Sequence, residues 1–200
     1  MLSGLQTAVL LALAVALGVW LAPRVGLRAP AVSSWLVGRP AGPALRAQLV
    51  PGLWGGVAGA AWLWLLSRLA PAALQPSDPA NAMPLLVKLL YGGITEELLM
   101  RWGVMTLLLW LGWRLLRRGH GQPRNGLVAT AVLFSAVLFA VGHLPAAQAM
   151  AGVLTMPVVA FVLVGNTVFG LVAGGLFARH GLEAAIIAHV LAHLLASPLL

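Results

Sequence analysis

Long apolar runs, separated by short segments rich in Pro, Gly and Arg, dominate the chain. The runs lie near residues 5–22, 51–70, 84–113, 127–144, 153–178 and 184–197. A helix of roughly 20 apolar residues crosses the hydrocarbon core of a bilayer. The pattern therefore predicts an all-α, polytopic membrane protein with about six transmembrane helices. At 200 residues, the chain has no room left for a separate soluble domain.

Two connections interrupt the apolar runs. Segment 23–50 carries four prolines and four arginines around a short apolar stretch, and is predicted to be a loop or to lie partly in the membrane interface. Segment 71–83 is rich in Pro, Ser, Asp and Asn. It is predicted to be a polar connection in which Ser77 or Asp78 caps or turns the chain.

Glycines at close spacing occur at Gly92-Gly93 and at Gly170 and Gly174. Small residues let helix backbones approach each other in lipid. Because the rest of a phosphate-loop motif is absent, these glycines are predicted to serve helix packing rather than phosphate binding.

Composition supports the membrane assignment. Hydrophobic residues make up 61% of the chain and charged residues 8%, whereas about a quarter of the residues of a soluble domain are charged. The net charge of +8 does not indicate nucleic acid, because the basic residues cluster between apolar runs. By the positive-inside rule, the arginine-rich loops are cytoplasmic and both termini lie outside. The absence of cysteine excludes a thiolate nucleophile, a disulfide and a Cys-ligated metal.

The segment GGITEELLMRW, residues 92–102, places two of the four acidic residues side by side within an apolar run. Glu96 follows Pro84 by roughly 18 Å of helix, near the middle of the bilayer. A carboxylate at that depth costs on the order of 3 kcal/mol, so it indicates function. Glu97 and Arg101 share a helix face and are predicted to form a structural ion pair, which leaves Glu96 as the reactive group. The alternative is one structural polar cluster of all three.

Three histidines, His143, His189 and His193, also lie within apolar runs, and His189 and His193 share one helix face. They are predicted to converge with the glutamates in one cavity. A buried glutamate and a neutral histidine can activate water, and further neutral imidazoles can donate hydrogen bonds to an oxyanion. Glu96, His143 and His189 would also suit Zn²⁺ with an open water position. The HExxH and G-x-S-x-G motifs are absent.

Three other titratable residues are predicted to have structural or solvated roles. His120 and His180 lie in basic loops. Glu183 begins the last apolar run, where an acidic side chain suits the positive end of a helix dipole.

On these residues the chain resembles the CPBP or Abi family of intramembrane endopeptidases, which includes the type II CAAX prenyl endopeptidases. The family pattern is E-E-x-x-x-R, then F-x-x-x-H, then H-x-x-x-N. The first motif is matched by Glu96-Glu97-Leu98-Leu99-Met100-Arg101, the second by Phe139 to His143, and the approach to the third by residues 168–189. The resemblance covers about 84–196 and implies two domains: residues 1–83, with two transmembrane helices and a basic loop, and residues 84–200, a protease core in the last four helices.

The resemblance also implies roles for individual residues. Glu96 and His143 would activate water, His189 would donate to the oxyanion, and Glu97 with Arg101 would support them. The chain departs from the family at the last position, where His193 replaces the usual Asn. A neutral histidine donates one hydrogen bond, from whichever nitrogen holds the proton.

The preferred interpretation is a multi-pass protein of the cell membrane that hydrolyses peptide bonds of an unidentified peptide or protein substrate. It needs no cofactor, with zinc as the alternative, and its partners are the substrate and the lipid bilayer. A second interpretation is a non-catalytic protein of the same fold that binds a partner, as in bacteriocin self-immunity. A third is a proton-coupled transporter, since buried Glu and His also form proton relays. Inverted repeats and paired broken helices, which would support a transporter, are not evident.

Overall fold

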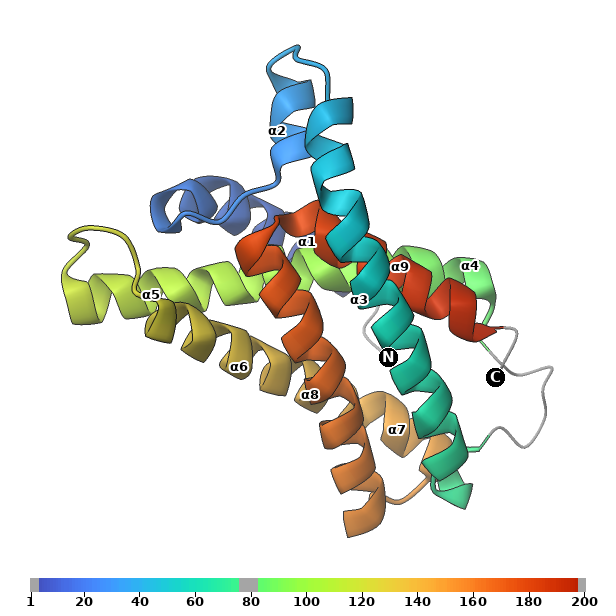
Figure 1. Cartoon of the computed structure of the whole chain (residues 1–200). Helices are drawn as coiled ribbons and strands as arrows, with labels where there is room; N and C mark the ends of the chain where they lie inside the picture. Colours follow the sequence, from blue (N-terminus) through green and yellow to red (C-terminus); the bar gives the residue numbers. More distant parts are fainter. Residues whose placement is uncertain (1–3, 76–82, 198–200) are drawn as a thin grey trace.

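A computed structural model describes residues 4–75 and 83–197 of the chain, and in these residues every regular element is a helix. The all-α prediction is therefore confirmed. The elements are α1 (Gly4–Leu21), η1 (Ala22–Val25), α2 (Pro30–Leu36), α3 (Gly42–Leu69), η2 (Ala72–Leu74), α4 (Leu85–Val87), η4 (Lys88–Thr95), η5 (Leu98–Met105), α5 (Thr106–Arg117), α6 (Asn125–Gly142), α7 (Leu144–Ala151), α8 (Met156–Arg179) and α9 (Leu182–Ala196) (Figure 1).

Four stretches in the described part of the chain are helical, long and apolar enough to cross a membrane: Gly4–Val25, Gly42–Leu69, Asn125–Ala151 and Met156–Arg179. A fifth predicted span corresponds to α9, an apolar helix of 15 residues. The sixth corresponds to residues 85–117, where α4, η4, η5 and α5 follow one another without a break. We call this run the central helix. The membrane assignment is confirmed, while the count of six spans stays a prediction.

The predicted start of the second span, at Pro51, is wrong. Helix α3 begins at Gly42, and Pro51 lies inside it. A proline removes one backbone donor and need not end a long, well-packed helix. Segment 23–50 is accordingly not a plain loop, since it contains η1, α2 and the first turns of α3. In the second connection, Ser77 and Asp78 lie outside the described residues.

Glycines bring α3 against α9, which it crosses (Figure 1). A Cβ added at Gly52 would lie 2.8 Å from the Ile187 side chain, and one added at Gly56 would lie 2.6 Å from Leu191. Real Cβ atoms essentially never approach so closely, so a larger residue would force the two helices apart. This glycine face of α3 fixes the position of α9, which carries two of the predicted site histidines.

The predicted packing role of Gly170 and Gly174 is confirmed. A Cβ at Gly170 would lie 2.8 Å from Ala136, and a Cβ at Gly174 would lie 2.9 Å from Val132. Both contacts are with α6, so these glycines let α8 and α6 pack backbone to backbone.

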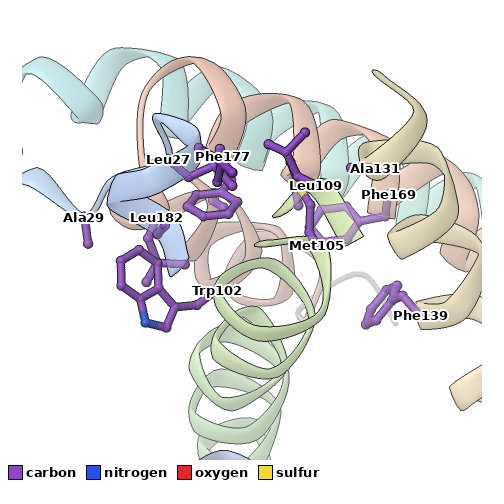
Figure 2. Close-up of a cluster of buried hydrophobic side chains, with 14 of the residues drawn as sticks. Leu27, Ala29, Trp102, Met105, Leu109, Ala131, Phe139, Phe169, Phe177 and Leu182 are labelled. Atoms are coloured by element: carbon purple, nitrogen blue, oxygen red, sulfur yellow. The ribbon is translucent and has the colours of Figure 1, made fainter. Parts of the chain in front are cut away.

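The largest buried apolar cluster joins the central helix to the N-terminal segment and to the last helices. Figure 2 shows Trp102, Met105 and Leu109 of the central helix together with Phe177 of α8 and Leu182 of α9. The Trp102 and Phe177 rings lie 6.1 Å apart. Since residues 22–29 also contribute to this cluster, the core runs across the predicted division at residue 83, which stays a prediction.

Glu183 lies in the first turn of α9, as predicted, but its carboxylate accepts hydrogen bonds from the start of another helix, α2. Its Oε1 accepts hydrogen bonds from the backbone N–H groups of Ala31, at 2.8 Å, and Val32, at 2.9 Å. These N–H groups belong to the start of α2, where no carbonyl within that helix can accept from them. Glu183 therefore ties α2 to α9.

Candidate active site

The predicted acidic pair lies between two π-helical segments of the central helix. Both η4 (Lys88–Thr95) and η5 (Leu98–Met105) are π-helical, and only Glu96 and Glu97 between them are α-helical. The Thr95 hydroxyl donates to the Leu90 carbonyl at 3.2 Å, five residues back, and Thr106 donates to Arg101 in the same way. The predicted helix is present, but most of its residues around the acidic pair are π-helical, which the sequence analysis did not predict. Such π segments are frequent at functional sites.

Glu97 is completely buried in a network of charges. Its Oε1 lies 2.7 Å from Nδ1 of His189 and 3.2 Å from Nη1 of Arg101. Arg101 is also buried; its Nη2 donates to the Gly170 carbonyl at 3.3 Å and its guanidinium lies 4.7 Å from the centre of the Phe139 ring. The predicted Glu97–Arg101 ion pair is present. The contact with His189 was not predicted, and it links the central helix to α9.

Glu96 faces a different side chain and is held more loosely. Its Oε1 lies 3.8 Å from Nε2 of His143, and the two side chains are 18% and 31% exposed. This distance is too long for a direct hydrogen bond. The predicted pairing of Glu96 with His143 is thus present as a close approach of two polar groups rather than as a bond.

The tautomer of His143 follows from its backbone contact. His143 lies between α6 and α7, and its Nδ1 is 2.8 Å from the Phe139 carbonyl oxygen. A carbonyl only accepts hydrogen bonds, so Nδ1 carries the proton and the neutral ring presents a lone pair at Nε2. Glu96 and His143 therefore offer two acceptors to the space between them, which suits a water molecule that donates to both.

His189 is constrained in the same manner. Its Nδ1–H donates to Glu97, so the neutral ring has no proton at Nε2, and only the doubly protonated ring offers an N–H there. A hydrogen bond from Nε2 of His189 to an oxyanion would thus require the doubly protonated ring, and the role of His189 as oxyanion donor stays a prediction. The ring is packed between His193, stacked at 5.0 Å between centroids, and Phe169 at 4.6 Å.

His193 lies against the central helix at a glycine. A Cβ added at Gly92 would come within 2.9 Å of His193 Nε2, and a Cβ at Gly93 would come within 2.5 Å of Val190. The predicted packing role of Gly92-Gly93 is confirmed. Within the described residues the His193 ring makes no hydrogen bond, so either ring nitrogen can carry its proton.

A cavity of about 470 Å³ brings the predicted residues together. Glu96, His143, His189 and His193 all line it, while Glu97 and Arg101 lie behind its wall. Four of the six predicted site residues thus share one cavity, but Glu97, which was expected to lie there too, is not among the lining residues.

Three polar residues in the cavity wall, Lys88, Tyr91 and Asn166, were not assigned to the site from the sequence. Asn166 of α8 donates one amide hydrogen to the Val162 carbonyl at 2.9 Å, which leaves the second for the cavity. The available signal was an amide in the middle of an apolar run. Lys88 begins η4 and is the only lysine of the chain.

The described residues do not form a preassembled zinc site. Within residues 4–75 and 83–197, no three His, Cys, Asp or Glu side chains are grouped so that they could hold a metal ion. The proposed set of Glu96, His143 and His189 includes one nitrogen, Nδ1 of His189, that already donates to Glu97. Whether a metal takes part stays a prediction.

A comparison with protein-family models finds one that matches residues 78–195, more than half of the chain, and is described as type II CAAX prenyl endopeptidase Rce1-like. No curated protein and no solved structure matches the chain.

Proposed function

Because the chain belongs to the Rce1-like type II CAAX prenyl endopeptidase family, we propose that it is an intramembrane endopeptidase in which Glu96 and His143 activate water. The observation that carries this proposal is the approach of two acceptors, Glu96 Oε1 and His143 Nε2, to 3.8 Å at the cavity wall. The membrane setting and the peptidase family both support it.

In the proposed reaction, a water molecule donates its hydrogens to the Glu96 carboxylate and to Nε2 of His143. The water oxygen attacks the carbonyl carbon of the scissile peptide bond while Glu96 accepts the proton, as a general base does. The tetrahedral intermediate then collapses, the C–N bond breaks, and the proton passes to the leaving amine. General acid–base catalysis of this kind contributes typically about 10²–10⁴-fold to the rate.

We assign oxyanion stabilisation to the two histidines of α9. His193 can present an N–H toward the central helix in its neutral form, because its ring makes no other hydrogen bond in the described part of the chain. His189 presents one only when doubly protonated. In this proposal, Glu97 and Arg101 do not touch the substrate; they position His189 through its 2.7 Å bond to Glu97. No step requires a metal, and zinc bound by Glu96, His143 and His189 is the alternative that chelation would test.

The test is a proteome-wide comparison of new protein N-termini in membranes of cells that express wild type or Glu96→Gln at equal levels. The amide is nearly isosteric with the carboxylate but cannot act as a base. Termini present only with wild type would establish proteolysis and identify substrates. A chelator that removes those termini would shift the mechanism to zinc.

The second candidate function is partner binding without catalysis. It is favoured by His193, which stands where the family has Asn. Identical sets of termini from wild type and Glu96→Gln, with both proteins folded and abundant, would support it.

We also propose a cell-membrane location with both termini outside the cytoplasm, because the arginine-rich loops fall on the opposite side. The chain has no cysteine, so a single cysteine placed near Gly4 or Ser197 is a unique label site. A membrane-impermeant maleimide should modify both variants in intact cells. Labelling only after lysis would reverse the orientation.

A further inference from the structure

Asn166 carries an amide in the middle of the apolar helix α8 and lines the cavity. Its Nδ2 donates one hydrogen to the Val162 carbonyl at 2.9 Å. Within the described residues this is the hydrogen bond of the side chain, so the second amide hydrogen is free. The carbonyl of the preceding residue, Gly165, accepts from the Trp62 indole of α3 at 2.9 Å, which fixes this turn of α8.

Two neighbours on α8 define the face on which Asn166 lies. Gly170, four residues later, packs against α6, since a Cβ there would lie 2.8 Å from Ala136. Phe169, three residues later, lies against the His189 ring of α9, with centroids 4.6 Å apart. Residues three and four apart share a helix face. Asn166 therefore lies on the face of α8 that is directed at both α6 and α9.

The same contacts place Asn166 near two residues of the candidate site. The glycine contacts between α8 and α6 step back four residues along α8 and forward four along α6. One further step brings Asn166 opposite Ala140, in the last turn of α6, and His143 follows directly after that helix. On the other side, Asn166 lies one turn beyond Phe169 from the connection to α9, and His193 lies one turn beyond His189. Asn166, His143 and His193 all line the cavity.

The site is rich in acceptors and poor in donors that are independent of protonation. Glu96 Oε1 and His143 Nε2 are acceptors, and so is Nε2 of neutral His189. His193 presents an N–H to the cavity in one tautomer and a lone pair in the other. The oxyanion of a tetrahedral intermediate requires donors that are already in place. An amide such as Asn166 offers its N–H at any pH.

We propose that Asn166 is a further catalytic residue, whose free Nδ2–H donates a hydrogen bond to the oxyanion of the tetrahedral intermediate. This inference rests on the proposed function and adds a donor from α8 to the histidines of α9. Glu96 and His143 approach the scissile carbonyl from the central helix and the end of α6. Asn166 and His193 lie on two other helices, so the attacking water and the oxyanion donors come from different elements.

The plain alternative is an asparagine that only satisfies itself through the Val162 carbonyl and packs within α8. Loss of such a residue changes stability or substrate binding. Loss of a donor that acts only in the transition state lowers kcat and kcat/KM equally and leaves KM unchanged. Kinetics together with unfolding measurements therefore separate the two roles.

The experiment uses the purified full-length chain in detergent and peptides that span the cleavage sites found by the N-terminal comparison. Asn166→Leu removes the amide hydrogens at a similar side-chain size. Its kcat should fall about 10²–10³-fold, the loss typical of one oxyanion donor. KM should stay within about twofold of wild type. The unfolding temperature should not fall, because leucine suits an apolar helix.

A second-site variant tests whether the lost group is a donor. Asn166→Leu/His193→Asn places an amide on α9, at a position that lines the same cavity, and should recover at least about tenfold of the lost kcat. A packing defect in α8 would not be repaired from another helix. Wild-type kcat in Asn166→Leu would overturn the proposal, and so would a loss of kcat that follows the unfolding temperature and is not restored by His193→Asn.

The matched control is Ser135→Ala. Ser135 of α6 is also a polar side chain that donates to a carbonyl of its own helix, that of Val132 at 3.0 Å, but it is not among the cavity-lining residues. Because Ser135 does not reach the cavity, this variant should keep kcat within about twofold of wild type.

Failure of the proposed function has a different signature. If wild type cleaves no peptide and matches Glu96→Gln, catalysis is absent, and equilibrium binding decides the role of Asn166. The probes are a mixed-sequence decapeptide library with a phosphinate in place of the central peptide bond, which carries the tetrahedral oxyanion, and the matching amide library. Tighter binding of the phosphinates by wild type, lost in Asn166→Leu, supports the donor. Equal binding of both libraries, or a preference that survives in Asn166→Leu, rejects it.

Discussion

The carboxylates of Glu96 and Glu97 leave the same helix one residue apart and meet opposite surroundings. Glu97 is enclosed, with His189 at 2.7 Å and Arg101 at 3.2 Å. Glu96 lines the cavity, and its ion-pair partner in the described part of the chain is His143, at 3.8 Å. The residue with the stronger contacts is the one that lies away from the cavity.

The difference separates a positioning role from a chemical one. A buried charge must be matched by partners, and once matched it is costly to disturb. A general base must instead keep a lone pair free for the proton that it accepts. Glu97 meets the first description and Glu96 the second, so substitutions at the two positions should fail in different ways.

The largest effect is expected for Glu96→Gln on activity. Loss of the general base should lower kcat by about 10²–10⁴-fold. The thermal unfolding temperature in detergent should stay near that of wild type, because the 3.8 Å contact of Glu96 with His143 is too long for a hydrogen bond. Rates on the substrates found by the N-terminal comparison provide the measurement. An active Glu96→Gln variant would contradict the assignment of Glu96 as the base.

Glu97→Gln should fail by unfolding. Neutralising Glu97 leaves Arg101 buried without its counter-charge, which costs about 3–5 kcal/mol. Thermal unfolding in detergent measures the loss, and the double variant Glu97→Gln/Arg101→Met should lose less than the sum of the two single variants. Wild-type stability in Glu97→Gln would show that the ion pair does not hold the fold.

Substitutions at the adjacent residues Gly92 and Gly93 should also separate an effect on activity from an effect on stability, with smaller changes. Gly92→Ala places a methyl group against Nε2 of His193, a side chain that can move, and should lower kcat about tenfold with little loss of stability. Gly93→Ala places it against Val190, whose backbone nitrogen would lie 3.3 Å away, and should destabilise by about 1–3 kcal/mol. Paired measurements of kcat and unfolding temperature test both. Equal changes of kcat and of unfolding temperature in both variants would show that the two glycines do not differ in role.

The smallest effect is expected for His193→Asn, which installs the family residue. An amide donates a hydrogen bond without depending on a tautomer, so kcat should stay within a few-fold of wild type and lose some of its dependence on pH. The pH–rate profile is the measurement. A loss of more than tenfold would mean that the imidazole of His193 is itself required.

Local patterns predicted those features that depend on neighbours in the chain. The pairing of Glu97 with Arg101 follows from four-residue spacing, and the role of Gly170 follows from the need for small residues between helices. The cavity residues were found because ionisable side chains are rare in apolar runs. These arguments need no knowledge of which helices touch.

Contacts between helices that are distant in the sequence could not be predicted from such local patterns. The bond from His189 to Glu97 joins residues 92 positions apart and depends on how closely α9 approaches the central helix. The two π segments are defined by backbone hydrogen bonds between residues five apart, and a four-residue periodicity in the sequence does not reveal them. Pro51 was misleading because proline usually ends a helix, whereas the packing of α3 keeps it in place.

The π segments also determine where the length of this protein can vary. A turn closed by i→i+5 hydrogen bonds holds one residue more than a turn closed by i→i+4 bonds. A deletion of one residue within η4 can therefore be absorbed by converting a π turn to an α turn, with the downstream helix kept in register. The same deletion within α5 would rotate everything after it by about 100°. Among related sequences, single-residue gaps are accordingly expected at η4 and η5 rather than in α5.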